Sequence, residues 1–99
     1  MPTRVLYSAW QLQCCGDAFS VGDTVEWTAV PVAGSRPEFG ADGANVEWAE
    51  EHHPSKRTRM SPVSGVVSSI RRVRDGVADD VASADGTGPA LIGYVVTLD

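Results

Sequence analysis

The sequence predicts an all-β fold, namely a single domain over residues 1–99 that forms a small SH3-like or OB-like barrel of five to six short strands. Three observations predict it: short runs alternate between apolar and polar residues, Gly-rich turns separate these runs, and no long stretch has helical periodicity. With only 99 residues, closing one twisted sheet on itself is the economical way to bury its faces and remove exposed edges.

The first predicted strand covers residues 5–12, and both of its alternating faces are largely apolar. This pattern is typical of a strand that is buried on one side and partly covered on the other. Gly16 and Asp17 then break either periodicity, so we expect a turn there.

The second predicted strand, residues 24–30, follows a turn at Phe19–Asp23 and has the clearest alternation in the chain. Val25, Trp27 and Ala29 alternate with polar residues, which predicts a half-buried strand with a polar outer face. Large aromatic side chains bury the most apolar area, so we expect the core to be dominated by the tryptophans: Trp10, Trp27 and Trp48.

The middle of the chain has weaker patterns. Residues 31–43 are rich in Gly and Pro, which indicates an irregular connection. Residues 46–52 alternate as a strand does, and their helix-forming residues would equally suit a short helix; we favour the strand. Residues 54–62 indicate a basic loop, and residues 77–89 a short strand followed by a loop.

Two further strands are predicted over residues 65–73 and 90–98. In the first of them Val66 and Ile70 share one face, and Val73 joins them only through a bulge. The second is rich in β-branched residues and closes the chain.

Positive charge is concentrated in one part of the chain, although the net charge is −5. Residues 56–74 contain six basic residues and no acidic ones, whereas the other 80 residues contain two basic and thirteen acidic ones. Acidic residues in 42–51 and 75–85 flank this segment, and pairing with them within the fold is the plainest interpretation. The candidate binding residues are the arginines of this segment and one tryptophan: Arg57, Arg59, Arg71, Arg72, Arg74 and Trp48.

From this segregation of charge we predict a non-enzymatic binding module that contacts a protein partner through the basic strand and its adjoining loops. A barrel that binds single-stranded nucleic acid, with exposed aromatic rings as stacking platforms, is an alternative that the negative net charge disfavours. A homo-oligomer is a further alternative if a tryptophan or a barrel edge is exposed.

Two adjacent cysteines and two adjacent histidines, Cys14, Cys15, His52 and His53, offer another alternative, a zinc-binding or thiol-redox protein. Adjacent residues of an extended chain point in opposite directions, and established zinc sites separate their cysteines by about two to four residues. We therefore expect no cofactor, with one cysteine packed inward as a small apolar group.

Glu50 and Glu51 precede the histidines, and this cluster has the residue types of a general acid/base pair or of a carboxylate–imidazole metal site. No nucleophile motif and no Gly-rich phosphate loop accompany it. We therefore expect no enzyme, and we interpret residues 50–53 as solvated side chains at the end of a strand.

The composition also bears on location and source. No apolar run approaches the roughly 18 residues that a membrane helix needs, and the first residues lack the pattern of a secretory signal. We therefore expect a cytoplasmic protein without membrane contact. Seven of the eight basic residues are Arg, and Ala, Gly and Val are abundant, which is typical of high-GC coding and predicts a bacterial source.

Residues 10–27 contain the motif WQxxCCGxxFxVGDxVxW, in which x is any residue. This motif resembles the opening of a family of small uncharacterised proteins from high-GC bacteria, a domain of unknown function. The similarity is clear over about the first quarter of the chain, with weaker matches at residues 51–53 and 65–70. It implies no activity.

Overall fold

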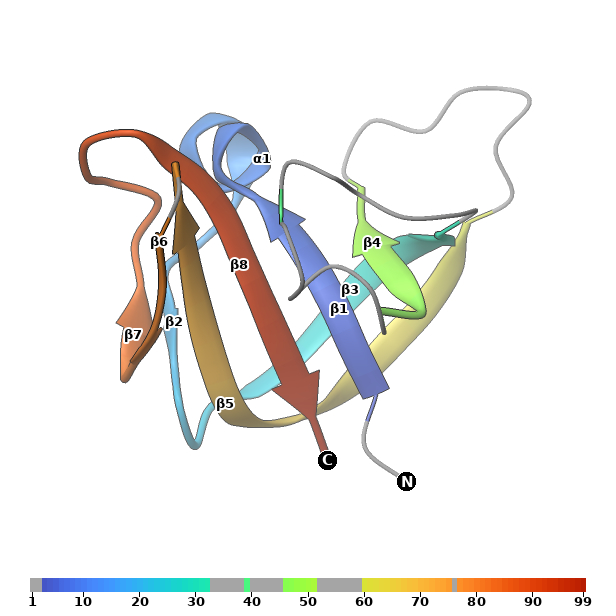
Figure 1. Ribbon diagram of the computed structural model, residues 1–99. Helices are drawn as coiled ribbons and strands as arrows, with labels where there is room; N and C mark the ends of the chain where they lie inside the picture. Colours follow the sequence, from blue (N-terminus) through green and yellow to red (C-terminus); the bar gives the residue numbers. More distant parts are fainter. Residues whose placement is uncertain (1–2, 33–38, 40–45, 52–59, 76) are drawn as a thin grey trace.

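The computed structural model describes residues 3–32, 39, 46–51, 60–75 and 77–99 of the chain. In chain order, its elements are β1 (Thr3–Ser8), α1 (Ala9–Cys15), β2 (Phe19–Ser20), β3 (Thr24–Pro31), β4 (Trp48–Glu50), β5 (Ser61–Arg74), β6 (Val77–Val81), β7 (Ser83–Ala84) and β8 (Leu91–Leu98). Figure 1 shows α1 at one end of the strands, opposite the end where the two termini lie.

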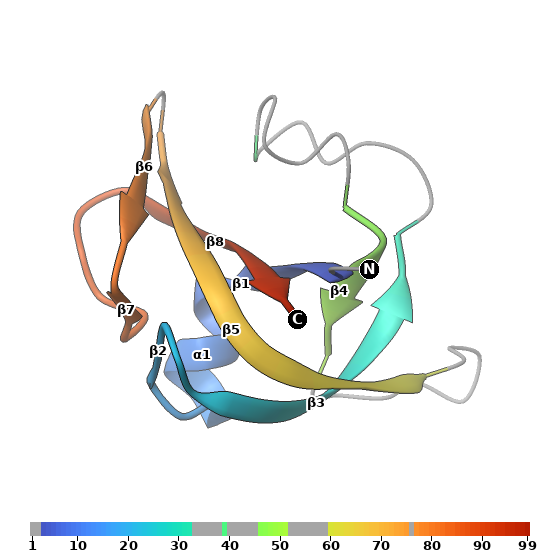
Figure 2. The same ribbon diagram turned by 90° about the horizontal axis from the view of Figure 1, so that it is seen from below.

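Five of the strands close into a barrel. They are hydrogen-bonded in the order β3-β4-β1-β8-β5, and β5 also pairs with β3, which completes the ring seen in Figure 2. β6 extends the sheet beyond β5, while β2 and β7 form a separate two-stranded sheet. The predicted all-β barrel is therefore confirmed.

The first predicted strand is wrong in its second half, because β1 ends at Ser8 and residues 9–15 form α1. Ser8 keeps extended backbone angles just before the helix, and at the other end the N–H of Gly16 donates to the C=O of Leu12 at 3.3 Å. Leu12 is buried, whereas Trp10 is 54% exposed. In residues 9–15, buried and exposed side chains therefore follow the period of a helix and not the two-residue period of a strand.

Aromatic and branched apolar side chains fill the barrel. The buried members of this inner core are Val5, Tyr7, Leu12, Phe19, Ala29, Val63, Val67, Ile70, Ala84, Tyr94, Val96 and Leu98. The expectation that the tryptophans dominate is wrong: Trp10 is exposed, and Trp27 and Trp48 are only partly buried where they pack against this core. Tyrosine and phenylalanine supply its buried rings instead.

A second, smaller core lies on the opposite face of the barrel wall. Its buried residues are Leu6, Phe39, Val73 and Val95. Leu6 is opposite Val95 in the pairing of β1 with β8, and it alternates with the inward-facing Val5. This outer core explains why the sequence of β1 is apolar on both faces.

The strand predicted over residues 65–73 is confirmed as part of β5, but its predicted facing is wrong at Val66. Val67 and Ile70 are buried in the inner core, whereas Val66 is exposed. The register against β8 shifts between Val67 and Ser69, so one extra residue of β5 changes which side chains point inward.

The strand favoured within residues 46–52 is confirmed as β4, which runs parallel to β1 and antiparallel to β3. The predicted connection at 31–43 and the predicted basic loop fall mostly outside the described residues, except that Ser61 and Pro62 begin β5. α1 has 7 residues, far fewer than the roughly 20 that span a bilayer, and the described part of the chain holds no other candidate helix.

Gly93 of β8 lies where the fold leaves no room for a side chain. A Cβ atom there would lie 2.5 Å from the backbone oxygen of Tyr7 and 3.0 Å from the ring of Phe39. The backbone of the β1–β8 ladder cannot move aside, so Gly93→Ala should lower the free energy of unfolding by about 2–4 kcal/mol in urea denaturation.

Gly22→Ala is the matched control for this steric effect. Gly22 has a φ of +95°, but no described atom lies within 4 Å of a Cβ built there. Its substitution should therefore cost only backbone strain, about 1–2 kcal/mol. Equal losses in the two variants would contradict the steric explanation at Gly93.

Candidate functional site

The hairpin of β5 and β6 carries three of the predicted binding arginines, and all three contact aspartates of β6. Arg72 donates to both carboxylate oxygens of Asp79, from Nη2 at 2.6 Å and from Nε at 3.2 Å. Arg71 Nη1 lies 3.2 Å from Asp80 Oδ1, and Arg74 Nη2 lies 3.9 Å from Asp79 Oδ1. The register creates these contacts, because Arg72 is opposite Asp79 and Arg71 is opposite Asp80.

These ion pairs neutralise the positive charge that the sequence places on β5. The hydrogen bonds from Arg72 hold the pKa of Asp79 below its usual value, so its carboxylate stays charged near neutral pH. The side chains are partly exposed, and exposed pairs of this kind contribute little to stability. The ion pairs change the surface charge: the hairpin carries both positive and negative groups and does not form a positive patch.

The structure describes only some of the remaining predicted site residues. Those outside the described part of the structure are Arg57, Arg59, His52, His53 and the side chain of Cys15. Cys14 is exposed on α1, and Trp48 packs against the inner core from β4. Within the described ranges no three His, Cys, Asp or Glu side chains gather as a metal site requires. The zinc alternative, which needs the two histidines, stays a prediction.

Glu50 is buried, with 3% of its surface exposed, so the interpretation of this residue as solvated is wrong. It is opposite Ala29 in the β3–β4 pairing, and Ala29 belongs to the inner core. Burial raises the pKa of Glu50 to about 8, and the nearby charge of Glu51 adds to the shift. The side chain of Gln11, also buried, donates from Nε2 to Glu51 Oε1 at 2.6 Å.

A cavity of about 130 Å³ adjoins Glu50 and Glu51 between β1, α1, β3 and β4. Its lining combines four polar residues, Ser8, Gln11, Glu50 and Glu51, with five apolar ones, Leu6, Trp10, Val30, Phe39 and Ala49. A protonated carboxylic acid in such a place can donate a hydrogen bond at neutral pH. The sequence singles out this acidic pair but not the burial that changes its chemistry.

Among the described residues, one edge of β3 is not covered by another strand. β5 pairs with residues 24–29 of β3, whereas on the other side β4 reaches only residues 29–31. The N–H of Val67 donates to the C=O of Asp23, which fixes the alternation of the β3–β5 ladder. Thr24 and Glu26 therefore direct their backbone N–H and C=O groups away from β5, toward the uncovered side.

Within the described residues, no backbone group bonds to Thr24 or Glu26 on that side. The next outward-directed residue, Thr28, does have a partner, because its C=O accepts from the N–H of Glu51 at 3.0 Å. The uncovered edge of β3 thus begins where the hydrogen bonds from the segment of β4 end. We call Thr24–Glu26 the free edge of β3.

The free edge of β3 borders a cavity of about 440 Å³. The far side of this cavity is formed by residues 16–18, which connect α1 to β2, and by Phe19, the first residue of β2. Three rings meet beside it: the ring centroid of Trp27 lies 5.0 Å from that of Tyr7 and 4.9 Å from that of Phe19, both at steep angles. Because Tyr7 and Phe19 are buried, the partly buried Trp27 is the ring that this cavity exposes, beside the outward-directed backbone groups of β3.

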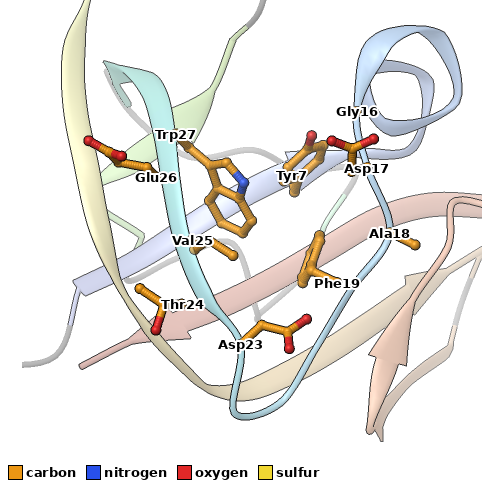
Figure 3. Close-up of a pocket in the computed structure, with 10 residues that line it drawn as sticks. All are labelled: Tyr7, Gly16, Asp17, Ala18, Phe19, Asp23, Thr24, Val25, Glu26 and Trp27. Carbon is orange, nitrogen blue, oxygen red and sulfur yellow. The ribbon is translucent and has the colours of Figure 1, made fainter.

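Acidic side chains surround this cavity. Figure 3 shows Asp17 beside Tyr7 and Asp23 beyond Phe19, while Glu26 points to the other side of β3 from Trp27. Asp23 Oδ2 accepts from the N–H of Ser20 at 2.8 Å and so stabilises the turn before β3. The described residues that line the cavity include no Lys, Arg or His.

Sequence reasoning predicts the strand that carries this site but not the site itself. Alternation correctly places Val25, Trp27 and Ala29 inward. An open edge is a property of how far the neighbouring strand reaches, and β4 is distant from β3 in the sequence. The shortness of the apolar alternation around Trp48 is the one sequence signal for it.

Comparison with known protein families matches residues 1–90 to a family described as a family of unknown function (DUF6578). This supports the resemblance to a domain of unknown function and leaves the bacterial source as a prediction. No curated protein and no solved structure matches the chain. The likeness to SH3 or OB barrels therefore also stays a prediction.

The buried Glu50 predicts a specific dependence of stability on pH. Its pKa rises from 4.5 to about 8 on folding, so the folded protein binds this proton more tightly than the unfolded chain does. The contribution of Glu50 to the free energy of unfolding should therefore fall as the pH rises from about 4.5 to 8, with a slope of up to about 1.4 kcal/mol per pH unit.

Glu50→Gln should remove that slope and make the variant more stable than the wild type at pH 8. Urea denaturation at several pH values between 5 and 8 (roughly one unit apart) measures the difference. Glu47→Gln, which changes an exposed glutamate three positions away, is the control and should keep the slope. Parallel pH profiles for wild type and Glu50→Gln would refute the assignment.

Proposed function

This chain belongs to the DUF6578 family of unknown function, and we propose that it is a non-enzymatic binding module that takes an extended segment of a partner protein along the free edge of β3. The observation that carries this proposal is the pair of outward-directed residues, Thr24 and Glu26, whose backbone groups face a cavity of about 440 Å³. Unmade backbone hydrogen bonds at a sheet edge are a ready template for an added strand.

The position of the cavity suits an added strand. A segment lying there would pair with β3 over Thr24–Glu26, which no described residue of β4 reaches. Its alternate side chains would point inward, toward Val25 and Trp27, or outward, beside Glu26. Main-chain bonds would supply affinity, and Val25 and Trp27 would select among side chains.

The basic strand that the sequence favours as the contact surface has less support. Arg71, Arg72 and Arg74 already contact Asp79 and Asp80 of the same hairpin. A partner there would have to compete with these ion pairs, whereas the free edge of β3 offers groups with no described backbone partner. We therefore keep the predicted protein partner and move its contact to β3.

Hydrogen exchange on the bound protein tests the proposal. A phage-displayed library of random peptides, selected on the immobilised full chain, supplies the probe. On binding, the amides of Thr24 and Glu26 should shift in two-dimensional NMR spectra and exchange at least about tenfold more slowly, because each gains a hydrogen bond. Selected peptides that leave these two amides unchanged would overturn the proposal, and so would a library that yields no binder.

Substitution of Glu26 gives an independent test with a matched pair of variants. Glu26→Pro removes an N–H that takes no part in the β3–β5 ladder, so the barrel should still form. Glu26→Val removes the same carboxylate but keeps the N–H. The proline variant should bind a selected peptide at least about tenfold more weakly than the valine variant. Equal affinities, with both variants folded by circular dichroism, would contradict strand addition.

A further inference from the structure

We infer that the segment bound along β3 carries Lys or Arg at the position opposite Glu26, with apolar residues at the positions on either side of it. This inference rests on the proposed function and specifies the chemistry of the partner. It follows from two different faces of the site: the charged outer face around Glu26 and the aromatic inner face around Trp27.

Glu26 lies on the outer face of β3, whereas Asp17 and Asp23 lie on the same side of β3 as Trp27 (Figure 3). A residue directly opposite Glu26 on an added strand would have its side chain on the same face as the Glu26 carboxylate. Glu26, Asp17 and Asp23 are exposed, and within the described ranges none of them forms an ion pair. A basic side chain opposite Glu26 would therefore gain an attractive cross-strand pair, and an acidic one would be repelled.

The distribution of the carboxylates favours an extended ligand over a single ion. Asp17 precedes β2, Asp23 lies in the turn before β3, and Glu26 lies on the outer face of β3. Among the described residues these groups do not converge as the ligands of a metal ion do. Carboxylates spread around the cavity attract a positively charged segment, and Glu26 is the one that a cross-strand partner would meet directly.

The inner face of the site selects for apolar side chains at the intervening positions. A residue opposite Val25 would point into the cavity toward Val25 and Trp27, which are only partly buried, with Phe19 buried behind them. Burying a charged side chain against these rings and the inner core would cost more than burying an aliphatic one. Together the two faces specify a basic residue opposite Glu26 between apolar neighbours.

Three blocked peptides of the same length test this inference: Lys-Val-Lys-Val-Lys-Val-Lys, its serine counterpart and its glutamate counterpart. Titration calorimetry on the full chain should show the lysine peptide binding about three- to tenfold more tightly than the serine peptide, and the glutamate peptide most weakly. The preference for lysine should shrink when the salt concentration is raised, because exposed charges are screened.

Charge reversal at Glu26 locates the effect. Glu26→Lys should weaken binding of the lysine peptide about five- to tenfold and strengthen binding of the glutamate peptide. Glu47→Lys changes the net charge equally at an exposed glutamate that does not line the cavity, and should alter each affinity less than about twofold.

The outcomes separate this inference from the proposed function. If library peptides protect the amides of Thr24 and Glu26 but the three designed peptides bind equally, strand addition stands and the charge preference is wrong. If both glutamate reversals have the same effect, the preference reflects net charge alone and the assignment to Glu26 is overturned. If no library peptide protects these amides, the proposed function itself fails.

Discussion

Unequal strand length is the constraint on which the rest of this structure depends. β5 has 14 residues and β4 has 3. Because β5 is long, its first part pairs with β3 and its second part with β8, and the register shift near Ser68 lets one strand join both sides of the ring. Because β4 is short, the ring closes while no described strand covers Thr24–Glu26 of β3 on that side. The candidate site is a direct result of that closure.

Among the described residues, carboxylates occupy three different environments. On the β5–β6 hairpin, opposite charges such as Arg72 and Asp79 are placed in register and satisfy each other. At Glu50, burial makes the neutral acid the favoured form near neutral pH. Around the cavity beside β3, carboxylates such as Asp17 have no described counterion. Only the third arrangement leaves an unbalanced charge for a partner to meet.

Alternation along the sequence predicts most of the strands, because it depends only on neighbouring residues; the inward position of Trp27 is an example. Alternation does not predict the helix α1, because its 7 residues, with apolar side chains on two faces, also fit a strand. The burial of Glu50 and the open edge at Thr24 depend on which distant strands become neighbours. Such pairings are set by the closed barrel, and the one local signal for them is the short apolar alternation around Trp48, which limits the length of β4.

β8 lies between β1 and β5 in the ring, yet the family match ends at residue 90, one residue before this strand begins. A fragment cut at that boundary would lack Tyr94, Val96 and Leu98 of the inner core. It would also leave β1 and β5 without the strand that lies between them. The limit of recognisable similarity is thus not the limit of the cooperative unit. Any shortened form meant to fold independently has to retain the last strand.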